Sequence, residues 1–214
     1  DDYAGYNGAC AQTGIIQLGC WAHARRKFVE AQKAAGKQKK AGKADVAVSM
    51  IAKLYAIEKR VESMAPEARH ALRQQESLPQ LQAIRAWLDK TLHTTLPKGL
   101  LGKALGYLDK NWDKLTIYTE DGRLSIDNNR AENAIRPFVV GRKNWLFSAS
   151  VAGAAASANL YSLIETAKAN GLEPYTYLRR VFTELPSAQS LDDIEALLPW
   201  QAPEAHDNLV KAAS

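Results

Sequence analysis

The sequence predicts an α/β protein in which helices predominate. Apolar residues recur every three or four positions through residues 45–115, and this spacing indicates an all-α block of three to four helices. A compact apolar run, IIQLGCW at residues 15–21, is the best candidate for a strand. The segment KLTIYTEDGRLSI, residues 114–126, is expected to form one or two short strands around the Asp121-Gly122 turn. The predicted strands therefore flank the helical block.

The remaining elements are expected to be mainly helical. Residues 22–36 and 151–171 each indicate one helix, which ends at Gly36 in the first case and at Gly171 in the second. A further helix is expected from about Asn128. Shorter elements are expected at residues 3–11, 173–185 and 190–200.

Composition and charge restrict the class of protein only moderately. The chain has a net charge of +5 and a pI of about 9.1, which is compatible with an anionic partner. Residues 23–43 carry eight lysines and arginines against Glu30 alone. No apolar run is long enough to span a membrane, no signal-peptide pattern opens the chain, and two cysteines cannot build a disulfide framework. Because the chain begins with Asp1 rather than Met, we expect it to be part of a longer protein.

The segment SIDNNRAENAIRPFVVGRKNW, residues 125–145, concentrates polar groups on one side of a helix. Asp127 is a plausible residue to cap this helix at its start. The residues that share the polar side are Asn128, Asn129, Glu132, Asn133 and Arg136. Asparagine is a poor helix former, so three of them within six positions favour a polar site. A solvated face explains the pattern equally well, and composition alone leaves both interpretations open.

Several motifs together resemble one protein family. They are DDYAGYNG, LGCWAHARRKFVEA, SIDNNRAENAIRPFVVGRKNWLFSAS, ANLYSLIETAKANGLEPYTYLRRVFTELP and IEALLPW. Over nearly its whole length the sequence resembles transposases of the insertion sequence 66 family. The resemblance implies a partial RNase H-like fold, with the all-α block as a large insertion, and an Asp-Asp-Glu triad that binds divalent metal.

The resemblance also implies which residues do the chemistry. Glu132 matches the glutamate of the triad and Asp1 its second aspartate, whereas Asp2 stands where many members have glycine. The first aspartate would lie upstream of residue 1, so we expect this fragment alone to be inactive. Mg²⁺ or Mn²⁺ in a two-metal site is the implied cofactor, because paired hard cations promote in-line displacement at phosphorus. Asn129 and Asn133 are expected to support the metal ligands.

Histidine and cysteine give weaker signals. His23 is expected near the carboxylates if residues 15–21 form a strand beside the one leading to Asp1, but a role in capping the following helix explains it equally well. Cys20 and His23 have no companion pair at zinc-finger spacing, so no structural zinc is expected.

Two groups of basic residues are candidate DNA contacts. Arg25, Arg26 and Lys27 are candidates for phosphate binding, although a solvated basic face is the simpler explanation for any one of them. Beyond Glu132, basic and aromatic side chains alternate, which suits backbone contacts combined with stacking on an unpaired base. The residues of this second group are Arg136, Arg142, Lys143 and Trp145. Trp145 could equally belong to a core.

These observations lead to one expected organisation and one expected function. We expect residues 1–44 and 116–185 to form the catalytic core, residues 45–115 the helical insertion, and residues 186–214 a helix and tail. The expected function is metal-dependent DNA cleavage and strand transfer, with transposon ends and target DNA as partners. We expect a homo-oligomer on DNA, a bacterial cytoplasmic location near the nucleoid, and no membrane contact. The alternatives are a non-catalytic DNA-binding remnant and a helical protein-interaction module, which would leave the asparagine-rich helix unexplained.

Overall fold

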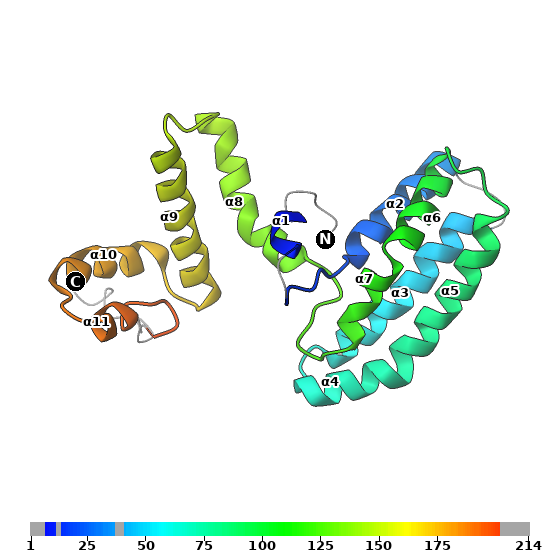
Figure 1. The fold of residues 1–214 in the computed structure, drawn as a ribbon, viewed down its shortest axis with the longest axis horizontal. Helices are drawn as coiled ribbons and strands as arrows, with labels where there is room; N and C mark the ends of the chain where they lie inside the picture. Colours follow the sequence, from blue (N-terminus) through cyan, green and yellow to red (C-terminus); the bar gives the residue numbers. More distant parts are fainter. Residues whose placement is uncertain (1–6, 12–13, 37–40, 202–214) are drawn as a thin grey trace, which may run out of the picture. The chain divides into compact units, whose positions relative to one another are not determined.

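The computed structural model describes residues 7–11, 14–36 and 41–201, and the chain divides into two compact units, Asp1–Arg130 and Ala131–Ser214. All regular elements within these described ranges are helical (Figure 1). In the first unit they are α1 (Asn7–Cys10), α2 (Trp21–Ala35), α3 (Lys43–Val61), α4 (Pro66–Leu72), the π-helical η2 (Arg73–Ser77), α5 (Leu78–Leu92), α6 (Leu100–Lys110), α7 (Trp112–Thr116) and η3 (Ile117–Thr119). Then follow α8 (Asn129–Trp145), α9 (Val151–Ala169), α10 (Pro174–Glu184), η4 (Leu185–Ser187) and α11 (Leu191–Glu195).

The α/β prediction, with its partial RNase H-like fold, is wrong, because the described part of the chain is all-α. Residues 15–20 form no regular element. Gly19 donates its backbone N–H to Lys114 at 2.8 Å, and Trp21 donates to Ile126 at 3.2 Å. Two single bonds to separate segments do not make the repeated ladder that defines a sheet. The second expected strand region, residues 114–126, starts instead as α7 and η3.

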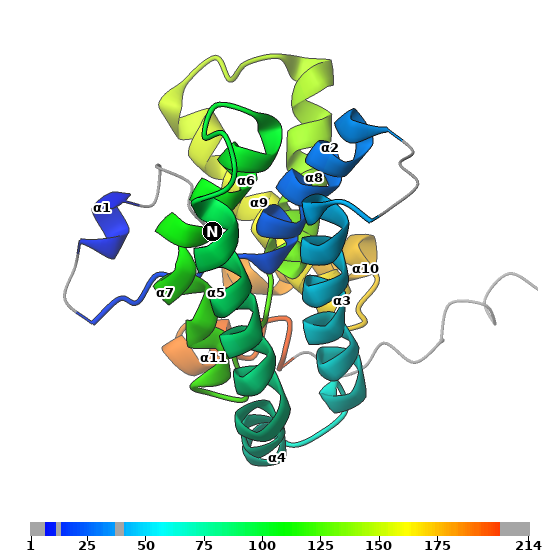
Figure 2. The same cartoon turned by 90° about the vertical axis from the view of Figure 1, so that its right-hand side faces the viewer.

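A four-helix core holds the first unit together. Helix α2 packs against α3 and α6, and α5 packs against the same two helices (Figure 2). Each helix buries an apolar stripe at spacings of three and four residues, as the periodicity predicts. The largest buried members are Trp21, Phe28, Ile51, Leu54, Ile84, Leu88, Leu105 and Leu108. The Trp21 indole also donates a hydrogen bond to the carbonyl of Leu115 at 2.8 Å, which fixes α7 to the start of α2.

The second unit has a smaller core, which lies around the end of α9. Gly171 has φ 74°, and the N–H groups of Gly171 and Leu172 bond back to Lys168 and Ala167 at 3.1 and 2.9 Å. This is the glycine-terminated helix end that the sequence predicts. Leu172 then packs with α10, and Tyr177 of α10 donates its hydroxyl to the carbonyl of Leu197 at 3.0 Å.

Candidate functional site

The start of α8 is anchored to the first unit through Asp127. Its carboxylate accepts the backbone N–H of Asn129 at 3.1 Å, the side-chain amide of Asn129 at 2.9 Å and the Tyr55 hydroxyl at 2.9 Å. Asp127 thus stabilises the helix start as expected. Burial and the neighbouring Asp127 carboxylate raise the pKa of Tyr55 well above its usual value, so Tyr55 stays a neutral donor. Together, the bonds to Asp127 link Tyr55 of α3 to Asn129, the first residue of α8.

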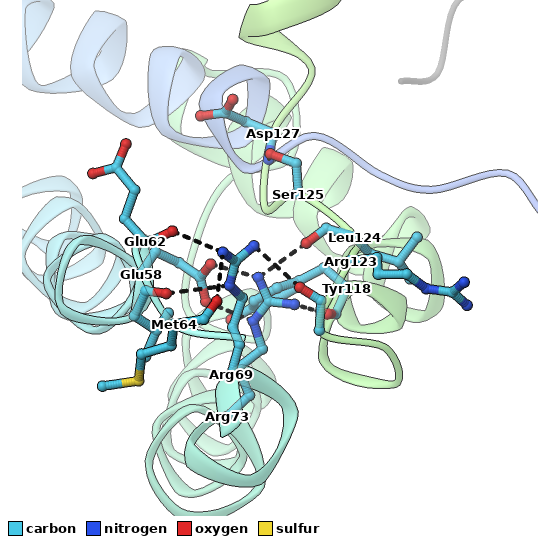
Figure 3. Close-up of polar contacts among 12 residues, drawn as sticks. Glu58, Glu62, Met64, Arg69, Arg73, Tyr118, Arg123, Leu124, Ser125 and Asp127 are labelled. Atoms are coloured by element: carbon cyan, nitrogen blue, oxygen red, sulfur yellow. Dashed lines mark hydrogen bonds and ion pairs between the residues drawn. The ribbon is translucent and has the colours of Figure 1, made fainter. Parts of the chain in front are cut away.

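Two arginines hold the segment that leads into α8 (Figure 3). Arg73 donates to the carbonyls of Tyr118, Asp121 and Leu124 at 2.7, 2.9 and 2.9 Å. Arg69 donates to the carbonyl of Gly122 at 3.1 Å. These bonds satisfy carbonyls in residues 118–124 that no sheet or helix ladder serves.

A basic groove of about 560 Å³ lies in the first unit between α2 and α3. Its cationic lining residues are Arg25, Arg26 and Lys33, and Glu30 is the acidic one. Arg25, Arg26 and Lys33 are exposed, so their charges remain available to a ligand. The groove also reaches Tyr55 and Asn129, so it extends to the first residue of α8. An open, cationic groove of this kind suits a phosphate backbone.

Lys27 and His23 lie outside that groove. The Lys27 ammonium lies over the ring of Tyr107, 4.8 Å from its centroid, and is half-buried. His23 is half-buried in the first turn of α2. The structure therefore separates Lys27 from Arg25 and Arg26, with which the sequence had grouped it.

Glu132 lies in the first turn of α8 and is half-buried, whereas Asn133 and Arg136 are exposed. Pro137 lies inside the same helix and has no N–H, so the carbonyl of Asn133 receives no hydrogen bond from it. The described residues contain no group of three or more His, Cys, Asp or Glu side chains that could hold a metal ion. Asp1 lies outside the described residues, so its predicted approach to Glu132 stays a prediction.

The basic and aromatic residues after Glu132 cluster at the other end of α8. Arg142 and Lys143 occupy its last turn and are exposed. Trp145 is 38% exposed and contacts Phe138 and Tyr161 edge-on or tilted, with ring centroids 5.9 Å away in both cases. Trp145 therefore packs within the second unit and keeps part of its ring accessible, and its role in stacking on a base stays a prediction.

Sequence reasoning missed Arg73, Lys33 and the Tyr55–Asp127 bond. A signal for Arg73 was present, because Arg69, Arg73 and Ser77 continue the four-residue spacing that leads to the buried Leu81. An arginine in a buried stripe indicates a charge that is paired inside the protein. The Tyr55–Asp127 contact joins positions 72 residues apart, and no local pattern signals it.

Clustered basic side chains on one face of a domain are a common feature of proteins that bind nucleic acid. Comparison with known families agrees: residues 1–156 match the family described as "Transposase IS66 family", and residues 162–200 match "IS66 C-terminal element". The chain belongs to the IS66 transposase family. The resemblance inferred from the sequence motifs is thereby confirmed.

Three relatives from Sinorhizobium fredii are similar along most of this chain. The chain is 34% identical to uncharacterized protein y4jD over 85% of its length, 32% identical to y4hP over 92%, and 33% identical to y4qI over 94%. It spans only 35%, 38% and 38% of those three proteins. No solved structure matches the chain.

Proposed function

We propose that this chain is part of a DNA transposase that cleaves and joins DNA strands by an Asp-Asp-Glu mechanism. The observation that carries the proposal is the family match over residues 1–156, a stretch that includes both Asp1 and Glu132. The missing partner would be an aspartate upstream of Asp1 in the longer protein. The fragment alone is therefore proposed to be inactive in cleavage.

Glu132 and Asp1 are the proposed metal ligands within this chain. Carboxylate oxygens are the ligands that Mg²⁺ and Mn²⁺ prefer, so the donor chemistry of these residues fits the implied cations. Of the proposed ligands, only Glu132 lies among the described residues, and the proposed site would need Asp1 and the upstream aspartate as well. A bound cation pair would activate the attacking oxygen and stabilise the leaving oxygen at phosphorus.

The other residues of the chain are proposed to bind and orient DNA. Arg25, Arg26 and Lys33 would neutralise backbone phosphates along the α2–α3 groove. Asn129 and Asn133, on the side of α8 that carries Glu132, would hydrogen-bond the metal ligands and fix their orientation. The Asp127–Tyr55 bond supports this role because it restrains the start of α8.

The proposed function also implies which partners the protein binds and where it acts. The partners would be transposon ends and target DNA, with a homo-oligomer formed on the DNA. A protein with these partners would act in the bacterial cytoplasm near the nucleoid. No helix among the described residues is long and apolar enough to cross a membrane.

Salt-dependent binding of duplex DNA tests the binding part of the proposal. We expect the affinity of this chain to fall steeply as salt rises, because bound phosphates release condensed counterions. The measurement is fluorescence anisotropy of a labelled duplex between 50 and 200 mM salt, a range over which affinity falls by about a thousandfold for a protein with six phosphate contacts. Affinity that is absent at low salt would favour a protein-interaction module instead.

A further inference from the structure

A small, open aromatic pocket lies where α8, the following loop and α9 meet, and the function proposed above does not use it. The pocket has a volume of about 320 Å³ and lies wholly within the second unit. Its aromatic lining residues are Trp145, Phe147 and Tyr161, and its hydroxyl-bearing ones are Ser148, Ser150 and Ser157. This volume is at the small end of the range for ligand pockets, about 300 to 1,000 Å³, so it suits one planar ring system.

Packing within the second unit makes one wall of the pocket rigid. Phe138 packs edge-on against both Trp145 and Tyr161, with centroid distances of 5.9 and 5.2 Å. Gly141 lies directly under the Trp145 ring, where a side chain at position 141 would collide with it. The Trp145 ring is therefore held in place by its neighbours before any ligand arrives.

Phe147 differs from the other two rings because it is exposed without a covering partner. It is 75% exposed, and it follows Leu146, which has the positive φ of 59° that residues other than glycine rarely adopt. The N–H of Leu146 bonds to the carbonyl of Arg142 at 2.8 Å, so α8 ends in this strained turn. Strain of this kind persists where the surrounding structure holds it, often at a binding site.

The chemistry of the pocket and its surroundings suits an unpaired nucleobase. Aromatic faces stack on any base, and serine hydroxyls both donate and accept hydrogen bonds, so they can meet different base edges. Arg142 and Lys143, in the last turn of α8 just ahead of the pocket residues, are exposed cations that can contact the flanking phosphates. An uncharged apolar partner would not need these two cations.

We propose that the pocket between the end of α8 and the start of α9 binds one unpaired DNA base, stacked on Phe147 and Trp145. This inference rests on the proposed function, since it assumes that the chain binds DNA. It adds a site for a base that has left the duplex, separate from the phosphate-binding groove of the first unit.

The test uses two duplexes of the same sequence, one fully paired and one with a single extrahelical 2-aminopurine, with the 214-residue chain at fixed salt. We expect roughly 5- to 150-fold tighter binding of the bulged duplex, the range set by the contribution of base–aromatic stacking, and quenching of 2-aminopurine fluorescence. Phe147→Ala should abolish this preference, and Phe147→Tyr should retain it because the aromatic face remains. Phe182→Ala is the matched control, because Phe182 is 59% exposed in α10 and does not line the pocket.

The outcomes separate this inference from the proposed function. If the chain binds both duplexes equally and 2-aminopurine is not quenched, the base pocket is refuted and DNA binding stands. If Phe147→Ala keeps the preference, or if Phe182→Ala loses it, the pocket is not where the base binds. If the chain binds neither duplex, the proposed function and this inference fail together.

Discussion

Arg73 and Glu58 form a two-pronged ion pair inside the first unit. The Arg73 guanidinium donates from Nε to Oε1 at 2.9 Å and from Nη2 to Oε2 at 2.6 Å. The Arg73 side chain is 1% exposed and that of Glu58 14%. Because Arg73 also serves three backbone carbonyls of residues 118–124, this pair joins α3, η2 and the segment that leads to α8 (Figure 3).

Replacement of Arg73 should therefore destabilise the first unit strongly. Arg73→Ala would leave the Glu58 carboxylate half-buried without its partner and would remove a donor from three carbonyls, of which only that of Asp121 keeps another bond, from the Leu124 N–H at 3.1 Å. Loss of one member of a buried ion pair typically costs about 3–5 kcal/mol. Urea unfolding should show a decrease of this size in the free energy of unfolding. Arg73→Lys should also destabilise, because an ammonium cannot reproduce the two-pronged geometry.

Arg60→Ala provides the control for that experiment. Arg60 pairs with Glu76, but the two side chains are 56% and 38% exposed. Exposed pairs contribute about 0–1 kcal/mol, so this variant should unfold almost as the parent does. Equal losses for the Arg60 and Arg73 variants would contradict the distinction between the surface pair and the buried one.

Asp121 should make folding sensitive to acid. Hydrogen bonds from the Arg123 side chain and backbone lower the pKa of Asp121 to about 2. A carboxylate with a depressed folded-state pKa stabilises the fold above its unfolded pKa, about 3.9, and this contribution is lost as pH falls toward 2. Arg123→Ala should raise the pKa of Asp121 toward 3.9, as carbon-detected NMR titration can measure. An unchanged Asp121 pKa in that variant would show that the arginine is not the cause.

The sequence predicted the helices of the first unit well, because their stripes are periodic and local. The buried positions Ala24, Phe28 and Ala31 of α2 follow that periodicity. In the second unit, the expected end of α9 at Gly171 is confirmed by its positive φ of 74°. The errors concerned the two expected strand regions, residues 15–21 and 114–126. In the first, a short apolar run does not distinguish a strand from an extended segment that only packs. Ile15 and Ile16 are 46% and 68% exposed, so this run is not even a buried segment at its start.

The residues of α8 in the candidate site could be predicted from the sequence, whereas the groove could not. The identity of the polar residues on α8 follows from sequence motifs, and their spacing places Glu132 in the first turn. The groove between α2 and α3 depends instead on tertiary packing, which brings Tyr55 and Asn129 beside Arg25. The separation of Lys27 from its basic neighbours likewise depends on Tyr107, 80 positions away along the chain. Contacts between distant segments leave no local periodicity in the sequence.

Removal of the groove cations should weaken DNA binding in a salt-dependent manner. If Arg25 and Arg26 each neutralise one phosphate, the double alanine variant should lower the slope of log affinity against log salt by up to about two units. Lys27→Ala is the matched control, because this cation lies over the Tyr107 ring outside the groove. Anisotropy titrations across a salt series measure both slopes. A larger change for Lys27→Ala than for the double variant would show that the groove does not hold the phosphates.

Glu132 can be tested as a metal ligand in the full-length parent protein. Glu132→Gln should abolish metal-dependent DNA cleavage and leave DNA affinity largely intact. Glutamine keeps the size and one acceptor oxygen but loses the negative charge that holds a hard cation, and the phosphate-binding cations are unchanged. Thermal stability should hold or rise without metal, because removal of one of several neighbouring carboxylates relieves repulsion.

Two asparagine variants provide a comparison for the loss of cleavage in Glu132→Gln. Asn129→Ala and Asn133→Ala should weaken cleavage without eliminating it, since loss of a group that orients a metal ligand typically costs about 10- to 100-fold. Nicking of a supercoiled plasmid carrying the transposon ends, with Mg²⁺ or Mn²⁺ and with chelator, measures all three variants. Cleavage by the Glu132→Gln protein at the parental rate would exclude Glu132 as a metal ligand. The polar side of α8 would then serve DNA binding alone, as in a non-catalytic remnant of a transposase.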